Sequence, residues 1–331
     1  EISLGLVGSE MCIRDRDYYY FQGTNEDSVI HYTNKVKEFA KATHQPKYYY
    51  FAWANRLITY YLKTSRTNIA LYEVQNMLKE AQEEDDKTGL SRCYNIMSQI
   101  YTIKRFDSMA FEWRLKEIEL TEKYKLENYN ISQTYAQIAN YYINQKKQKE
   151  ALAAVEKAIA TANSSTQQIS AKLEFVNYYS KFGDFQAAEK LLKECQAAFE
   201  QDKRLESIKK RLYNIECLYY QQTKQYQKAL EAAKMQEKEE RRLSESILSS
   251  IHYRTQGEIY QKMGNMNLAV KYLQMYINTD DSLKIANEQV ASSEFATLLN
   301  VEKLNAEKKE LMLQAQEKEL HNKTTLIISL I

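Results

Sequence analysis

Residues 177–192, NYYSKFGDFQAAEKLL, contain the pattern that decides the fold. Tyr179 is followed by Gly183, and Ala188 stands nine residues after the tyrosine. The residues on both sides are mostly good helix formers, whereas the segment between them is short, polar and contains a glycine, which is typical of a helix C-terminus. The stretch therefore predicts one helix, a short turn and a second helix.

The same spacing of tyrosine and alanine recurs six times along the chain. Successive tyrosines stand 37 to 41 residues apart, and an alanine follows each of them after nine residues. The pairs are Tyr61 and Ala70, Tyr101 and Ala110, Tyr142 and Ala151, Tyr179 and Ala188, Tyr220 and Ala229, and Tyr260 and Ala269. These six tyrosines are called the key tyrosines below. Each unit is predicted to fold as a helix, a turn and a second helix.

Small side chains accompany the repeat in a way that suits close helix packing. In four units a small residue stands three positions before the key tyrosine: Ser98, Ala139, Cys217 and Gly257. Small residues here and at the alanine position would let the two helices of a unit approach closely. The unit at 90–125 is the weakest match, because Arg114 and Glu117 stand where apolar residues are expected.

The repeat resembles the tetratricopeptide repeat, whose pattern also places an alanine nine residues after a tyrosine. The best local matches are residues 177–192 and residues 253–273, YRTQGEIYQKMGNMNLAVKYL. The period is near 40 rather than 34, the tryptophan position carries tyrosine, and the terminal proline is missing. HEAT-like arrays have a similar period but lack this offset. The resemblance implies an all-α, right-handed α-solenoid of six helix pairs over 48–282, preceded by a partial unit at 17–47.

Composition agrees with a helical, non-catalytic chain. One proline and seven glycines in 331 residues favour helix almost throughout, and 46 basic against 44 acidic residues give no global reason to expect nucleic acid. The histidines are scattered, and Cys93, Cys195 and Cys217 match no zinc or redox motif. We therefore expect no enzyme activity, no metal site and no cofactor.

A binding groove is predicted on the concave face of the solenoid, lined by the first helix of each pair. The expected groove positions lie six and two residues before the key tyrosine, and they are rich in side-chain amides: Asn55, Asn95, Asn214, Gln99, Asn140 and Asn177. An amide can donate and accept together, so such a ladder can hold an extended peptide, as it does in some peptide-binding members of the resembled family. Arg92, Arg211 and Arg254 would add contacts to anionic groups. The alternative is that these side chains are ordinary solvated surface.

The first sixteen residues do not fit the rest of the chain. Residues 6–16, LVGSEMCIRDR, resemble the conceptual translation of a transposase sequencing adapter. We therefore expect residues 1–16 to be non-native and leave them out of the fold prediction.

The C-terminal part changes character after the repeats. Residues 283–323 are predicted to form one long charged helix, with Leu299, Ala306, Leu313 and Leu320 at seven-residue spacing. This spacing indicates a coiled coil, and a dimer through residues 295–323. Residues 324–331, TTLIISLI, are interpreted as the start of a truncated transmembrane helix.

This order of segments resembles the sensor half of membrane-anchored signalling regulators of Bacteroidetes-type bacteria. In them the repeat array is extracytoplasmic, and a cytoplasmic histidine kinase or DNA-binding domain follows the membrane helix. The resemblance implies a non-catalytic sensor that binds a protein or peptide and is tethered to a membrane. The alternative is a freestanding, soluble cytoplasmic scaffold that assembles other proteins.

Overall fold

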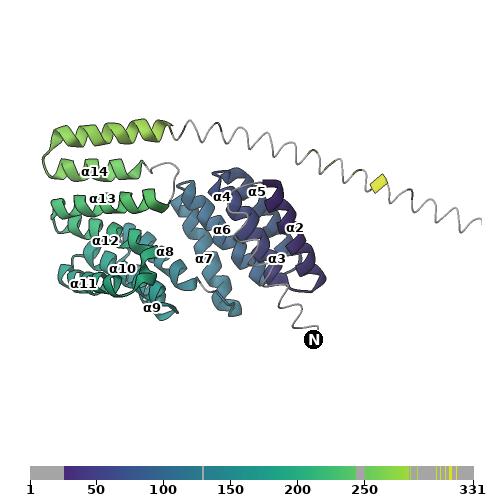
Figure 1. Ribbon diagram of the computed structural model, residues 1–331. Helices are drawn as coiled ribbons and strands as arrows, with labels where there is room; N and C mark the ends of the chain where they lie inside the picture. The colour runs from purple at the N-terminus through teal and green to yellow at the C-terminus, as the bar shows by residue number, and fades with distance from the viewer. Residues whose placement is uncertain are drawn as a thin grey trace, which may run out of the picture. The chain divides into compact units, whose positions relative to one another are not determined.

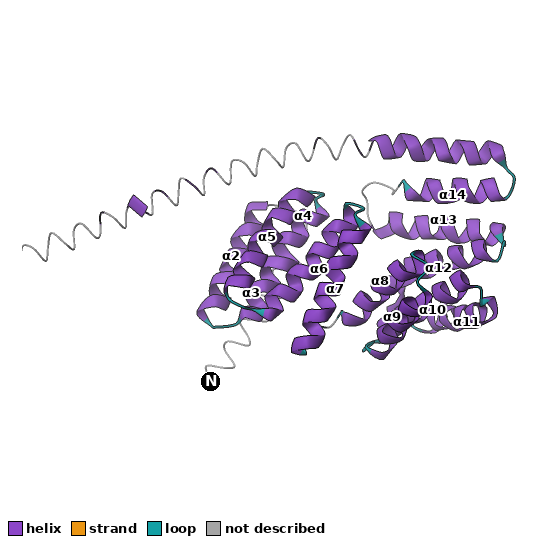
Figure 2. Ribbon diagram, turned by 180° about the vertical axis from the view of Figure 1, so that it is seen from behind, coloured by secondary structure: helices purple, strands orange, loops and turns teal. Residues whose placement is uncertain are grey.

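The computed structural model describes residues 26–128, 130–243 and 250–282, together with isolated helical positions between 284 and 318. All regular structure in these ranges is helical, without a strand (Figures 1 and 2). The chain divides into two compact units after Glu84. The expectations for residues 1–16, for the start of the partial unit at 17–25, and for most of 283–331 lie outside the described residues.

Unit 1 contains the half unit and the first complete helix pair. Helix α2 (Glu26–Ala42) is followed by a composite first helix, which consists of α3 (Pro46–Ala52), the π-helical segment η1 (Trp53–Ile58) and α4 (Thr59–Lys63). The second helix is α5 (Thr67–Glu83). Pro46 stands at the first position of α3, where its missing N–H removes no helical hydrogen bond.

Unit 2 consists of five helix pairs joined end to end. In each pair the two helices are connected by a short turn and lie side by side (Figure 1). The pairs are α6 (Lys87–Ile103) with α7 (Asp107–Tyr124), α8 (Ile131–Asn144) with α9 (Gln148–Ala160), α10 (Ser165–Phe182) with α11 (Phe185–Gln201), α12 (Lys209–Gln222) with α13 (Tyr226–Leu243), and α14 (Ile251–Lys262) with the helix at 266–282. A 3₁₀ segment, η2 (Lys203–Ile208), leads into α12.

The turn inside each pair repeats one local geometry. The residue four positions after the key tyrosine has a positive φ, and the N–H of the following residue donates to the carbonyl of the key tyrosine at 2.8–3.0 Å. The left-handed residues are Ser65, Arg105, Lys146, Gly183, Lys224 and Gly264. The bond satisfies a carbonyl that the end of the first helix would otherwise leave unpaired.

The repeated alanine is buried in every pair. Relative exposure is 0–2% at the six positions Ala70, Ala110, Ala151, Ala188, Ala229 and Ala269. In the last pair a Cβ atom at Gly257 would lie 2.8 Å from Cγ of Leu273, so the first helix approaches the second too closely for any side chain. The predicted all-α solenoid of helix pairs is confirmed in the part of the chain that the structure describes.

The pair α6–α7 buries polar residues at the two positions where the repeat pattern breaks. Arg114 donates through Nε to Oε1 of Gln137 at 2.7 Å and through Nη2 to Oγ1 of Thr102 at 2.8 Å. The Glu117 carboxylate is 2% exposed and accepts hydrogen bonds from Asn95 and Asn128. Burial is tolerated here because both charged groups are hydrogen-bonded.

Candidate functional site

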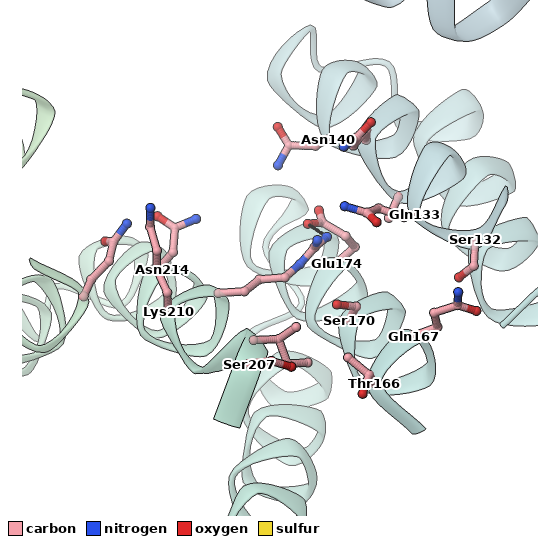
Figure 3. A pocket seen from close by; sticks show the side chains of 15 residues that line it. Ser132, Gln133, Asn140, Thr166, Gln167, Ser170, Glu174, Ser207, Lys210 and Asn214 are labelled. Atoms are coloured by element: carbon pink, nitrogen blue, oxygen red, sulfur yellow. Dashed lines mark hydrogen bonds and ion pairs between the residues drawn. The ribbon is translucent and has the colours of Figure 1, made fainter. Parts of the chain in front are cut away.

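A polar groove of about 670 Å³ lies along three successive first helices of unit 2. Helices α8, α10 and α12 form its walls, and the end of η2 and Gln236 of α13 complete it. Figure 3 shows the side chains that converge on it from the three helices. The first helices therefore line a common groove here, as the repeat predicted for a solenoid.

Each of the three helices presents one polar face to the groove. The lining residues stand three or four positions apart, which is the spacing of one helical face: Gln133, Gln137 and Asn140 on α8, Thr166, Ser170 and Glu174 on α10, and Ser207, Arg211 and Asn214 from η2 to α12. Ala136 and Ile208 are the apolar residues in the lining. The groove thus offers amides and hydroxyls, which both donate and accept hydrogen bonds.

An ion pair links α10 and α12, two walls of the groove. Nη2 of Arg211 lies 2.6 Å from Oε1 of Glu174, and the second carboxylate oxygen accepts from Nδ2 of Asn177 at 3.3 Å. Glu174 is 3% exposed, whereas the Arg211 side chain is 25% exposed. The Nε atom of Arg211 is buried without a hydrogen-bond acceptor among the described residues. Lys210 adds a second positive charge to the lining.

Three of the predicted site residues line this groove, namely Asn140, Arg211 and Asn214. The Oδ1 atom of Asn140 accepts from Nδ2 of Asn144 at 2.9 Å, so its own NH₂ group is directed elsewhere. Asn177 holds the equivalent position on α10 but is 8% exposed and lies beneath the groove, where its amide holds the Glu174 carboxylate.

Two further predicted residues, Asn95 and Gln99, lie on α6, where the partly buried Asn95 bonds to the buried Glu117 of α7 and Gln99 is exposed. The Asn95 amide donates to both oxygens of Glu117 at 3.2 and 3.1 Å and accepts from Nε2 of Gln99 at 2.6 Å. The Asn95 amide already has protein partners for donation and acceptance.

The remaining predicted residues are not part of the described lining of this groove. Asn55 is exposed in η1 of unit 1. Arg92 is partly buried in α6, and that burial lowers the pKa of its guanidinium. Arg254 donates through Nε to Oε1 of Glu258 at 2.8 Å, one turn along α14.

One position of the repeat lines the groove but is not among the predicted groove positions. The position nine residues before the key tyrosine lines it in all three helices, as Gln133, Ser170 and Arg211, but only the arginine was selected. Glu174 and Lys210 were also missed. The signal was present as a polar residue at that same offset in three consecutive repeats.

The chemistry of an enzyme is not evident in the described ranges. They contain no group of three or more His, Cys, Asp or Glu residues that could hold a metal ion. Burial raises the pKa of the Cys93 thiol to about 12 and that of the Cys195 thiol to about 11, so neither is a ready nucleophile at neutral pH.

None of the helices within the described residues is long and apolar enough to cross a membrane.

Neither a family model nor a curated protein sequence matches this chain. Solved structures do resemble it. A tetratricopeptide repeat protein from Parabacteroides merdae gives a TM-score of 0.51 at 14% identity, over 87% of this chain and 99% of that one. NprR in complex with its cognate peptide NprX gives 0.56 at 13% identity, over 77% of this chain and 73% of NprR. The apo form of RapI gives 0.52 at 14% identity, over 84% and 93% of the two chains. At these identities the likeness defines the fold alone, which is a tetratricopeptide-like α-solenoid.

Proposed function

We propose that this chain is a non-catalytic interaction module that binds an extended peptide segment of a partner in the groove of unit 2. One observation carries the proposal: three consecutive first helices bring amide, hydroxyl and charged side chains to a single groove of about 670 Å³.

The lining suits the backbone of an extended peptide. An extended peptide leaves its own N–H and C=O groups unpaired, and the side chains of Gln133, Asn140 and Asn214 can pair with both kinds of group. Ala136, Ile208 and the carbon stems of the polar side chains would add hydrophobic burial to these hydrogen bonds. NprR, a structure of similar fold, was solved with a peptide bound, which supports this kind of ligand.

The test begins with selection of binders from a displayed library of random dodecapeptides on the intact chain. The double variant Asn140→Ala, Asn214→Ala should weaken selected peptides by about 0.5–1.5 kcal/mol for each hydrogen bond lost. Thermal unfolding should change little, because neither amide is buried in the core. Asn278→Ala, an exposed amide on the helix at 266–282, is the matched control. If the selected peptides bind the double variant with unchanged affinity, the groove is not their binding site and the proposal is wrong.

We further propose that the module is the sensor of a membrane-tethered regulator, with the repeats on the extracytoplasmic side and a dimer contact through residues 295–323. The support is the order of segments in the sequence, in which a charged segment separates the repeats from the apolar residues 324–331. Fractionation of cells that express the native gene tests the tether. Integral behaviour in high salt and alkaline wash supports it, whereas a soluble product favours the cytoplasmic scaffold. Deleting 295–323 should convert a dimer to a monomer in sedimentation.

A further inference from the structure

Glu174 contributes a carboxylate to the lining of the groove. Its side chain lies near the centre of Figure 3, between Gln133 and Asn140 on one side and Lys210 and Asn214 on the other. It is held there by Arg211 from the next repeat, 37 residues along the chain. The groove therefore contains its own anion, supplied by the protein.

Arg211 has more hydrogen-bonding capacity than Glu174 uses. A guanidinium carries five N–H donors in a planar fork, and a carboxylate that binds along one edge of the fork takes two of them. In the structure one Nη atom bonds to Glu174, whereas Nε has no acceptor in the described part of the chain. Because Nε is buried, it can gain an acceptor only from a carboxylate that takes the place of Glu174 and binds along the edge formed by Nε and an Nη atom.

We infer that the groove selects a peptide that carries a carboxylate, and that this carboxylate replaces Glu174 as the partner of Arg211. The inference rests on the proposed function, because it names the ligand class of the same groove. Glu174 is then an internal competitor. It keeps Arg211 paired when the groove is empty, and a carboxylate ligand must displace it, so the pair lowers the apparent affinity for acidic peptides.

The experiment uses one groove-binding dodecapeptide with an acidic residue from the selection above, in four synthetic forms. The four forms combine the acidic side chain or its amide analogue with a free or an amidated C-terminus. These arms separate a side-chain carboxylate from a terminal one as the anchor. Affinities are measured by fluorescence anisotropy for the wild type and for the variants Arg211→Gln, Glu174→Gln and Glu174→Asp. Arg204→Gln, at an exposed ion pair with Asp202 outside the groove lining, is the control.

Replacing the anchoring carboxylate by its amide should weaken binding to the wild type about tenfold or more, and Arg211→Gln should abolish that preference. Glu174→Gln should tighten the acidic forms several-fold and leave the fully amidated form nearly unchanged, because it removes the competitor but keeps a side chain of the same size. Glu174→Asp serves the same purpose if the glutamine variant does not fold, since the shorter side chain reaches Arg211 less well. Groove binding without a preference for acid, or weaker binding of acidic peptides by both Glu174 variants, overturns the inference and leaves the proposed function intact. If no selected peptide depends on Asn140 and Asn214, the proposed function itself fails.

Discussion

Lys224 occupies the place in the α12–α13 turn that Gly183 occupies in the α10–α11 turn. Both stand four residues after a key tyrosine, and their φ angles are +60° and +91°. The following N–H donates to the tyrosine carbonyl in both turns, at 2.8 Å to Tyr220 and 2.9 Å to Tyr179. The turn thus imposes a left-handed residue whether or not the sequence supplies a glycine.

Glycine should improve the turns that lack it. A side chain with a Cβ atom is strained in the left-handed region, so Lys224→Gly should raise the free energy of unfolding by about 0.5–1 kcal/mol after the entropy of the unfolded glycine is subtracted. Gly183→Lys should lower it by a similar amount. A Cβ atom at Gly183 would meet nothing within 4 Å, so backbone strain is the only cause. Urea unfolding measures the free energy of unfolding of both variants. If it changes in the same direction in the two variants, strain in the left-handed region is not the cause.

The buried alanines should reject larger side chains. Ala188 and Ala229 are both 0% exposed, so a leucine at either position must displace a helix or adopt a strained rotamer. We expect Ala188→Leu or Ala229→Leu to lower the free energy of unfolding by about 1–3 kcal/mol. Ala197→Leu, on the exposed face of α11, is the control. Because each pair of a solenoid supports mainly its neighbours, hydrogen exchange should rise first around the altered pair. A uniform rise across unit 2 would argue against local coupling.

The close contact of Gly257 with Leu273 predicts strong coupling between these two positions. Gly257→Ala places a methyl group 2.8 Å from Cγ of Leu273, which costs more than the roughly 1 kcal/mol that alanine gains in a helix. Leu273→Ala opens that space. The two changes together should therefore destabilise less than the sum of the single changes, with an interaction free energy of about 0.5–3 kcal/mol in a double-mutant cycle. Additive effects would show that the helices can separate freely.

The buried Glu117 predicts a pH dependence of stability. Burial raises the pKa of its carboxyl group in the folded chain, and hydrogen bonds from Asn128 and Asn95 and the charge of Arg114 only partly oppose the shift. The folded state then binds the proton more tightly than the unfolded state. As the pH rises from the ordinary glutamate pKa through the raised value, the wild type must bury a charge and loses stability.

Glu117→Gln isolates this effect because glutamine is neutral at every pH. The stability of the wild type minus that of the variant should fall as the pH rises through this window and then become constant. Chemical denaturation at a series of pH values measures the difference. A difference that grows with pH would falsify the raised pKa.

The amide positions show how far the candidate site could be predicted. Asn140 and Asn177 both stand two residues before a key tyrosine, and the repeat assigns them the same role. Asn140 lines the groove, whereas Asn177 is buried beneath it. Helix α10 contacts η2 as well as α8, α9, α11 and α12, so its orientation depends on several neighbours at once. No single repeat contains that information.

The sequence by itself determined the helix pairs, their turns and the positions where two helices approach closely. Those features depend on hydrogen bonds that span five residues and on small side chains at fixed offsets, so the residues of each repeat are enough to determine them. Only the tertiary structure decided which face of each first helix borders the groove. One residue of register turns a helix face by about 100°, and neighbouring repeats set that rotation through packing. The pairing of Glu174 with Arg211, 37 residues away, is a consequence of that packing and has no local signal in the chain.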